Sequence, residues 1–507
     1  MRGGRAGCSI TCELAGRRWP ERSIGRVRLI HSACLLLALL VIGPAAASAD
    51  PVIVLDGPGR THVRNDPFLT AADTPPVPGH AVKPTARTVS SAKVAGPSVR
   101  SILARLRNAG EIGADEYAER VASYAAALRS RDGLFGTRRR ELQSVINNTD
   151  FFAAAGRLTA SRLPAVFLTL DRNREWWTSG TLLRSGDRIT FRGSRLIFQY
   201  YPGEGVQLQM LANFGRANGL WEGGFDESLG ELLDELLPLA SRRAGGIAWE
   251  YYFFFGGGRP PWGSAMAQGT AIQALSRAAA RLQEPAYLDA ARQALPIFSV
   301  DAPAGVRVRI GDGAHYALYS FAPGYRVING FLQSLVGLRD MATIGGSLKA
   351  KRLFELGDTE ARRELPAYDT GAWSMYDQTS ESDLSYHQLV TGFLTNLCRR
   401  TSTPAYCVTA ANFKRYEREP PRLALLTTRA GAGAAGRIRF RVSKISRVGM
   451  TVERGGQVYL STSATVSRGS HSYGWRAPSG AGLATVRLTA TDLAGNRGRR
   501  TATLRIG

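Results

Sequence analysis

The stretch that decides the predicted class of fold is SAMAQGTAIQALSRAAARL, residues Ser264–Leu282. Its apolar side chains recur at spacings of three and four, so they share one face of a helix: Ile272, Leu275, Ala279 and Leu282. Stretches with similar spacing are ESLGELLDELLPLAS (227–241), VINGFLQSLVGL (327–338) and DLSYHQLVTGFLTNLC (383–398). Between them, VRVRIGDGAHYALYSF (306–321) reads as two short strands around a Gly-Asp-Gly turn. Repeated helix pairs with an inserted hairpin predict an (α/α) toroid or barrel over residues 224–418.

The regions on either side of this barrel have different patterns. Residues 99–223 are mixed: SILARLRNAGEIGADEYAERVASYAAALRS (101–130) is helical, whereas LPAVFLTLDRNREWW (163–177) and GDRITFRGSRLIFQYYPGEGVQLQML (186–211) are predicted to be strands. Residues 419–507 contain short strands separated by Gly, Ser and Asn-Arg-Gly turns, which is typical of a small Ig-like β-sandwich. The predicted fold class is therefore α+β and multidomain, and the C-terminal module is expected to have no catalytic role.

The N-terminus predicts export. Basic residues precede the apolar run ACLLLALLVIG (33–43), and Ala47-Ser48-Ala49 offers a cleavage site, so residues 1–49 are predicted to be a signal peptide. The protein is then secreted or associated with the cell envelope. Residues 50–98, rich in Pro, Ala and Thr, are predicted to be an extended linker or a wrapping arm. Cleavage leaves Cys398 and Cys407, which we expect to form a disulfide in an exported protein, and no cluster of Cys or His has metal-ligand spacing.

The charge indicates a class of partner. The formal net charge is +24, and a basic surface favours polyanions such as acidic polysaccharide, cell-wall polymer or nucleic acid. Nucleic acid is the weakest of the three, since the chain has no basic run with interleaved aromatic residues and no helix-turn-helix or zinc-finger spacing. The charge therefore favours an acidic polysaccharide or a cell-wall polymer as the partner.

Four segments, taken in order, resemble the D-glucuronyl C5-epimerase family, whose members invert uronate residues within heparan-type polymers. The segments are FQYYPGEGVQLQMLANFGRANGLW (198–221), WGSAMAQGTAIQAL (262–275), YSFAPGYRVINGFLQSLVGL (319–338) and YDTGAWSMYDQTSESDLSYHQL (368–389). The resemblance covers roughly residues 195–417. It implies a β-rich region followed by an (α/α) barrel, a groove lined by tyrosines, no cofactor, and a glucuronate-containing substrate. It also raises the expectation of a homodimer.

The resemblance also implies the site residues. Tyr319, Tyr376 and Tyr386 match the tyrosines of the family, and we expect them to be catalytic. The residues expected to bind substrate are His387, Trp262, Gln268, Asn329, Arg326 and Arg259. Two positions depart from the family pattern: Leu318 replaces an acidic residue, and Thr379 replaces an arginine. The protein must therefore supply an acid and a cation from elsewhere if it is an epimerase.

Inversion at C5 sets requirements on those groups. A proton α to a carboxylate must leave and another must return to the opposite face, so two acid/base groups flank the ring. An unperturbed tyrosine has a pKa of about 10 and must be shifted down to act as a base. Ser382 or Asp383 is expected to cap a helix with Tyr386 in its first turn, but the helix dipole contributes only ~0.3–1 kcal/mol. Arg326 and Arg259 are the expected cations.

Glu250 is the predicted replacement for the missing acid. It lies among aromatic residues in WEYYFFFGGG (249–258), where burial would raise its pKa. Three other functions remain open. A polysaccharide lyase would remove the same proton, a non-catalytic glycan-binding protein would keep the groove after losing activity, and a glycoside hydrolase would pair Glu250 with Asp369 or Asp377.

Overall fold

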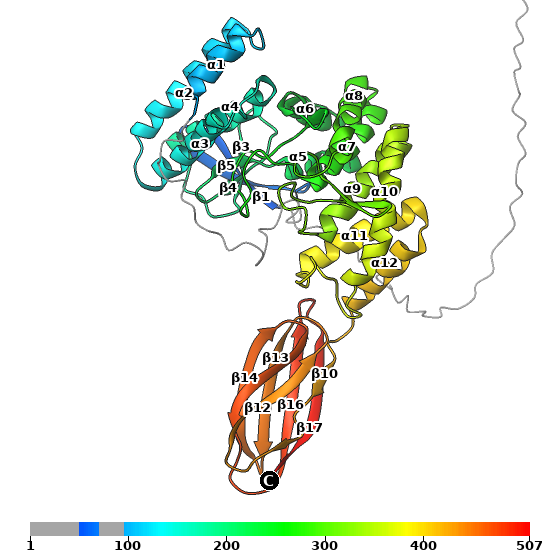
Figure 1. Cartoon of the computed structure of the whole chain (residues 1–507). Helices are drawn as coiled ribbons and strands as arrows, with labels where there is room; N and C mark the ends of the chain where they lie inside the picture. The colour runs from blue at the N-terminus through cyan, green and yellow to red at the C-terminus, as the bar shows by residue number, and fades with distance from the viewer. Residues whose placement is uncertain (1–49, 70–95) are drawn as a thin grey trace, which may run out of the picture. The chain divides into compact units, whose positions relative to one another are not determined.

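The computed structural model describes residues 50–69 and 96–507 (Figure 1). The predicted signal peptide, residues 1–49, and residues 70–95 of the predicted linker lie outside the described residues. The described chain mixes helices and strands, as the sequence predicts.

The first helices are α1 (Val99–Asn108), α2 (Ala114–Asp132), α3 (Gly136–Ala154) and α4 (Leu163–Ser179). The prediction of a strand at residues 163–177 is wrong, because this stretch forms most of α4. Its buried residues Leu163, Val166 and Leu170 follow helical spacing, and a proline occupies the first turn, where its missing N–H costs nothing. The aliphatic and aromatic content of this stretch favours a strand, but the spacing of its apolar residues is that of a helix.

A five-stranded sheet packs beside these helices in the order β2-β1-β3-β4-β5. Its strands are β1 (Asp50–Gly57), β2 (Arg60–Asp66), β3 (Arg188–Phe191), β4 (Phe198–Tyr201) and β5 (Gly205–Leu208). The linker prediction is therefore wrong for residues 50–66, which form a hairpin. β1 runs parallel to β3 with Val52 beside Arg188. In this position the apolar residues Val52, Val54 and Leu55 of β1 are buried.

The remaining helices form two layers. They are α5 (Met210–Gly223), α6 (Asp226–Leu236), α7 (Ala265–Leu282), α8 (Pro285–Ala294), α9 (Ile328–Thr343), α10 (Leu348–Glu364), α11 (Leu384–Thr401) and α12 (Pro404–Tyr416). α5, α7, α9 and α11 pack on one another in that order, and α6, α8, α10 and α12 each pack on the helix before them (Figure 1). Among the described helices, none is long and apolar enough to cross a membrane.

The two central helices, α7 and α9, touch through their backbones. A Cβ added at Gly269 would lie 2.6 Å from the Cα of Ser334, so a larger residue would force the helices apart. Two short hairpins connect the helices: β6 (Ser241–Arg243) with β7 (Gly246–Ala248), and β8 (Arg307–Ile310) with β9 (Gly313–Tyr316). The second hairpin confirms the strand pair predicted around the Gly-Asp-Gly turn.

The C-terminal residues form two sheets over a common apolar core. One has the order β10-β12-β15 and the other β11-β17-β16-β13-β14. Their strands are β10 (Leu423–Leu425), β11 (Arg429–Ala430), β12 (Ala435–Val442), β13 (Ser446–Arg454), β14 (Gln457–Val466), β15 (Gly469–Arg476), β16 (Gly482–Asp492) and β17 (Arg497–Ile506). Alternation along β12 buries Ile438, Phe440 and Val442 between the sheets.

A buried lysine joins these sheets to the helices. The Nζ of Lys444 lies 2.6 Å from Asp492 and donates to the carbonyl oxygens of Tyr416 and Glu419. It also lies 5.1 Å from the ring centroid of Trp373, which belongs to the helical region. A buried ammonium group is tolerated only when its hydrogen bonds are satisfied, and here several acceptors meet it. The junction is therefore a specific contact.

The predicted disulfide is confirmed: Cys398 in α11 is bonded to Cys407 in α12. The two cysteines are nine residues apart, so the bond closes a short loop. Replacing both by serine is expected to lower the free energy of unfolding by about 2–3 kcal/mol, because the unfolded chain regains the entropy of that loop. Urea unfolding of the double variant measures this loss. An unchanged midpoint would show that helix packing alone holds α11 and α12 together.

Candidate functional site

Five tyrosines from separate parts of the chain lie close enough to influence one another electrostatically. They are Tyr201, Tyr319, Tyr325, Tyr376 and Tyr386, and we call them the tyrosine cluster. Tyr386 is its hub, since its phenol acts on each of the other four. The rings of Tyr376 and Tyr386 are 5.1 Å apart between centroids, and those of Tyr319 and Tyr325 are stacked at 6.3 Å. The three sequence-predicted tyrosines are therefore brought together.

Different elements place these side chains. Tyr201 ends β4, Tyr386 lies in the first turn of α11, and the others lie in the segments that enter α9 and α11. The predicted helix cap is confirmed at Asp383, whose carboxylate accepts the backbone N–H of Tyr386 at 2.8 Å. Tyr319 is fully buried and Tyr376 almost so, whereas the other three keep part of their surface exposed.

An aromatic wall supports Tyr319. Its ring packs on Phe255, Trp262 and Phe321 at centroid distances of 5.5–5.8 Å. Trp262 in turn stacks on Tyr251 at 4.2 Å, and its indole N–H donates to the carbonyl oxygen of Phe253. Trp262 is only 1% exposed. It therefore holds Tyr319 in place, and the prediction that Trp262 itself contacts substrate is wrong, because the indole is enclosed by other rings.

Arg188 is the cation of the cluster. It lies in β3, is 4% exposed, and pairs with Asp50 of β1 at 3.0 Å. Its charge lowers the pKa of both Tyr201 and Tyr386. The parallel pairing of β1 with β3 brings Asp50 to this position, so a segment predicted to be a linker helps to hold the guanidinium group.

Tyr201 is also linked to the wall by a chain of hydrogen bonds. The side-chain N–H of Gln209 donates to the Tyr201 hydroxyl at 2.8 Å, and the Tyr251 hydroxyl donates to the carbonyl oxygen of the same amide at 2.9 Å. The backbone N–H of Leu211, in the first turn of α5, donates to the Tyr251 hydroxyl. The orientation of Tyr201 is thus fixed by the start of a helix.

The phenols are neutral in the free protein. Burial raises the pKa of all five above the ordinary value. The phenol of Tyr386 raises the pKa of each of the other four further. The carboxylate of Asp383 also raises the pKa of Tyr386, which opposes the effect expected from the helix dipole. Arg188 is the group that counteracts these effects at Tyr386. The cluster is therefore a set of proton donors, and ionisation of Tyr386 depends on added positive charge.

The carboxylate of Asp377 links Tyr325 to the loop that follows Tyr376. One carboxylate oxygen of Asp377 accepts the backbone N–H groups of Thr379 and Ser380, both at 2.7 Å, and the other accepts the Tyr325 hydroxyl at 3.0 Å. The hydroxyl of Thr379 donates to the same carboxylate. Thr379, which replaces the arginine of the family pattern, therefore shapes the loop.

Leu318, at the position of the missing acid, is buried at 1% exposure. A Cβ added at Gly330 in α9 would meet its side chain at 2.9 Å, so Leu318 fills the space beside the start of this helix. The apolar side chain thus packs the helix and leaves no carboxylate at this point.

The prediction that His387 binds substrate is wrong. The imidazole is fully buried and stacks on Trp373 with centroids 3.7 Å apart. One ring nitrogen forms a hydrogen bond with the Ser374 hydroxyl, and the other forms a hydrogen bond with the carbonyl oxygen of Phe413. Burial lowers the pKa of His387 to about 4, so the ring is neutral at neutral pH. It fixes the position of α11, and with it that of Tyr386.

The prediction that Glu250 has a raised pKa is also wrong. Its carboxylate is fully buried, as expected, but it accepts two hydrogen bonds from Arg162 and one from Arg243 at 2.6–3.1 Å. Burial alone would raise the pKa of Glu250, but these two arginines outweigh burial and lower it. The hydroxyl groups of Ser241 and Tyr252 complete the site. Glu250 is an ionised structural anchor, and it does not replace the missing acid.

Replacing Glu250 by Gln is expected to lower the free energy of unfolding at pH 7 by about 3–5 kcal/mol, because two buried guanidinium groups lose their counter-charge. Since its folded pKa lies below the usual 4.5, the carboxylate stabilises the fold at higher pH, and this contribution is lost as the pH falls through the folded pKa. Urea unfolding between pH 3 and 7 measures the effect. A variant as stable as the parent at pH 7 would contradict the anchor.

The remaining predicted residues lie as follows. Both ends of the Gln268 amide bind the backbone of Trp249, so this residue is structural. Arg326 pairs with Glu364 at 3.0 Å, and Arg259 is exposed; neither is among the charges that act on Tyr386, so the prediction that they supply its cation is wrong. Asn329 is 2% exposed, and neither polar atom of its amide has a hydrogen-bond partner among the described residues. Its contact with substrate stays a prediction.

The carboxylates proposed for hydrolysis are not available as a pair. Glu250 is held by arginines, and Asp377 is held by its loop and by Tyr325. Asp369 accepts the backbone N–H of Gly371 and the hydroxyl of Tyr416. Each is committed to an internal contact, so the hydrolase pairing is not supported.

Sequence reasoning missed Arg188, Tyr201 and Tyr325. The two tyrosines lie inside segments that resemble the epimerase family, so they could have been named with the others. Arg188 lies before the start of that resemblance, in RITFR (188–192), where alternation indicates only a strand. Its role depends on which strand pairs with β3, and the local sequence carries no sign of that.

The chain is similar to several known proteins. A sequence model of the family described as D-glucuronyl C5-epimerase C-terminus matches residues 245–415. The chain is 35% identical over 131 residues to D-glucuronyl C5-epimerase of Caenorhabditis elegans, a match that covers 23% of this chain and 21% of that protein. It is 30% identical over 139 residues to an uncharacterized protein of Methanocaldococcus jannaschii, covering 26% and 45%. The chain thus matches less than half the length of either relative.

Solved structures with similarity include two carbohydrate-active enzymes. They are endo-beta-1,4-glucanase of Acetobacter xylinum, at 13% identity with 44% of this chain and 74% of that chain covered, and cellobiose 2-epimerase of Spirochaeta thermophila, at 15% identity with 56% and 73% covered. The TM-score is 0.32 for each. From the matched sequence and the C. elegans relative, residues 245–415 belong to the D-glucuronyl C5-epimerase C-terminal domain family.

Proposed function

We propose that this protein is a uronate C5-epimerase that acts on glucuronate residues in an acidic polysaccharide. The observation that carries the proposal is the tyrosine cluster around Tyr386 with Arg188 beside it. The membership of residues 245–415 in the epimerase domain family supports it. The proposed reaction needs no cofactor, since acid/base groups and a cation suffice.

The proposed roles follow from charge. Arg188, which is buried and pairs with Asp50, acts through its charge: it favours the ionised form of Tyr386, which takes the proton from C5. The resulting negative charge spreads into the substrate carboxylate, and the positive charge of Arg188 favours it electrostatically. A phenol of the cluster that is still protonated delivers a proton to the opposite face of C5; Tyr319 and Tyr325, whose pKa values burial raises, both keep theirs. Arg188 thereby supplies the positive charge of the family's arginine, whose position is occupied here by Thr379.

We extend the proposal to the architecture and location. The two layers of helices α5–α12 are proposed to form an (α/α) toroid, and the C-terminal sheets an Ig-like module. The protein is proposed to be secreted or held at the cell envelope, on the grounds of its N-terminal sequence pattern, where a polymeric substrate is accessible. Homodimer formation stays a prediction from the family resemblance.

Incubation with a glucuronate polymer in heavy water tests the reaction. An epimerase introduces deuterium at C5 without shortening the polymer, and both C5 configurations appear. Formation of an ultraviolet-absorbing unsaturated end would identify a lyase, which shares the first proton transfer. Retention of the polymer on the protein without exchange would favour a non-catalytic glycan-binding protein.

A further inference from the structure

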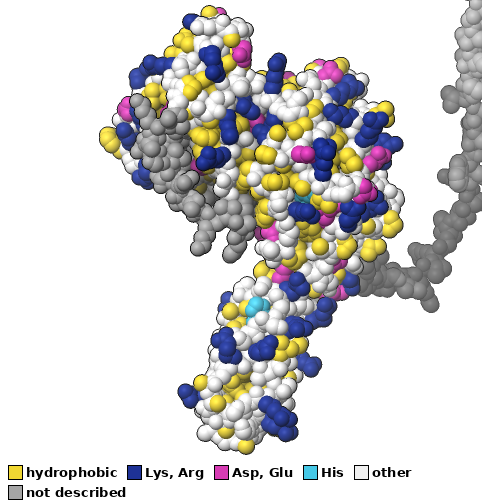
Figure 2. Space-filling model, viewed as in Figure 1, with side chains coloured by type: hydrophobic (Ala, Val, Ile, Leu, Met, Phe, Trp, Pro, Cys, Tyr) yellow, Lys and Arg dark blue, Asp and Glu magenta, His cyan; other side chains and the backbone are white. Residues whose placement is uncertain are grey.

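The C-terminal module concentrates the positive charge of the chain. Residues 419–507 contain fifteen Lys and Arg but only three Asp and Glu, so they account for half of the net charge of +24. Dark-blue basic side chains are spread over the C-terminal sheets on the face that Figure 2 shows. Like charges crowded on a small module repel one another, so this excess of positive charge opposes the compact state.

One face of the module carries its arginines in a regular row. β12 is the central strand of the sheet β10-β12-β15, and its alternation turns Arg437, Arg439 and Arg441 outward. Residues two apart on a strand are about 6.6–6.8 Å apart, so the row is evenly spaced. Arg422, paired with Ser443 beyond the end of β12, extends it, and Arg476, opposite Ala435, adds to its other end. We call these five residues the arginine face.

The arginine face has no acidic counter-charge. β10, β12 and β15 contain no Asp or Glu, and none of the five arginines forms an ion pair within the described residues. Arg437 donates instead to the hydroxyl of Ser472 at 2.7 Å, and Arg441 donates to Ser470 at 3.4 Å. These neutral partners orient the guanidinium groups and leave their charge uncompensated. On the other sheet Arg487 pairs with Glu453, whereas Arg497, Arg499 and Arg505 of β17 form no ion pair within the described residues and so suit a matched control.

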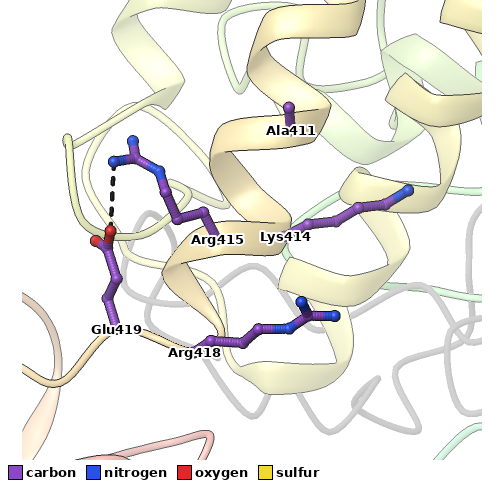
Figure 3. A pocket seen from close by; sticks show the side chains of 5 residues that line it. All are labelled: Ala411, Lys414, Arg415, Arg418 and Glu419. Atoms are coloured by element: carbon purple, nitrogen blue, oxygen red, sulfur yellow. Dashed lines mark hydrogen bonds and ion pairs between the residues drawn. The ribbon is translucent and has the colours of Figure 1, made fainter.

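The row leads toward the helical region. Arg422 donates to the carbonyl oxygen of Gly371, in the segment that precedes Tyr376. Four residues before it in the chain, Arg418 lines an open hollow of about 390 Å³ together with Lys414, Arg415, Glu419 and Ala411 (Figure 3). Arg415 pairs with Glu419 there, whereas no ion pair involves Lys414 or Arg418 within the described residues. Basic groups thus continue from the sheet to α12.

We propose that the arginine face binds a linear anionic polysaccharide and holds it along the module toward the helical region. Evenly spaced guanidinium groups suit carboxylate or sulfate groups repeated along a polymer, because each can form paired hydrogen bonds. The aromatic residues of β15, Tyr473 and Trp475, point into the core, so the outer face offers no ring on which a nucleic acid base could stack. The inference shares its ligand class with the proposed function but uses a different site.

Binding of fluorescently labelled heparin to the full chain tests the inference, with a DNA duplex of matched charge as the second probe. The variant R437Q/R439Q/R441Q is expected to bind heparin at least about tenfold more weakly, with a shallower dependence on salt. The matched control is R497Q/R499Q/R505Q, which removes the same charge from β17 on the other sheet. The control is expected to bind heparin within about twofold of the parent, since it leaves the row intact.

Equal losses in the two triple variants would overturn the inference, because only the net charge would then matter. Tighter binding of DNA than of heparin would overturn it in favour of a nucleic acid surface. The variant R437K/R439K/R441K keeps the charge but loses the paired hydrogen bonds, and intermediate affinity is expected. Heparin binding by a parent protein without C5 exchange would contradict the proposed function and leave this inference standing.

Discussion

Replacing Tyr386 by Phe is expected to lower the rate of deuterium exchange at C5 by about 10²–10⁴-fold, the usual contribution of a positioned acid or base. The substitution removes one oxygen from the hub of the tyrosine cluster. The ring of residue 386 still packs against that of Tyr376, with the centroids 5.1 Å apart. The helix cap at Asp383 is also kept, because it uses only the backbone N–H of residue 386. Activity should therefore fall while the thermal midpoint stays near that of the parent. The rate of deuterium exchange on a glucuronate polymer measures the activity, and calorimetry measures the thermal midpoint.

Tyr287→Phe is the matched control. Its hydroxyl donates to Asp234 between α8 and α6, away from the cluster, so exchange should be unchanged. Exchange by the Tyr386 variant at the rate of the parent would remove Tyr386 from the mechanism. A variant that loses exchange only because it unfolds would be recognised by its lowered thermal midpoint.

Replacing Arg188 by Gln is expected to reduce exchange at pH 7 by about 10²–10³-fold, as for other groups that stabilise developing negative charge. The sign of the pH effect follows from its charge. Arg188 lowers the pKa of Tyr386, so its removal raises that pKa further, and the rising limb of the rate moves to higher pH. Part of the lost activity should therefore return in alkaline solution. Exchange rates measured across pH 6–10 test this.

Arg326→Gln provides the comparison, since Arg326 pairs with Glu364 and is not among the charges that act on Tyr386. Its pH profile should match that of the parent. Arg188→Lys keeps a charge but not the planar fork, so a smaller shift is expected. If the Gln variant lost activity equally at every pH, Arg188 would bind substrate without tuning Tyr386.

The local sequence determined most of the helical region. Apolar spacing predicted α7, α9 and α11, the Gly-Asp-Gly turn predicted the hairpin β8–β9, and Asp383 was recognised as a possible cap. These features depend on residues only a few positions apart, so a single stretch specifies them. The tyrosines Tyr319, Tyr376 and Tyr386 were found because they lie inside long segments that resemble one family.

Only the tertiary structure decided the charges around the site. The local sequence around Glu250 predicts a buried acid with a raised pKa, but Arg162, 88 positions earlier in the chain, lies beside it and lowers that pKa. The sequence predicts that His387 binds substrate, but Trp373 and Phe413 enclose its ring in the folded protein. Arg188 gained its place through the pairing of β3 with a strand predicted to be a linker. A pKa depends on every charge and dipole within a few ångströms, and those neighbours come from distant parts of the chain, so no local pattern could supply them.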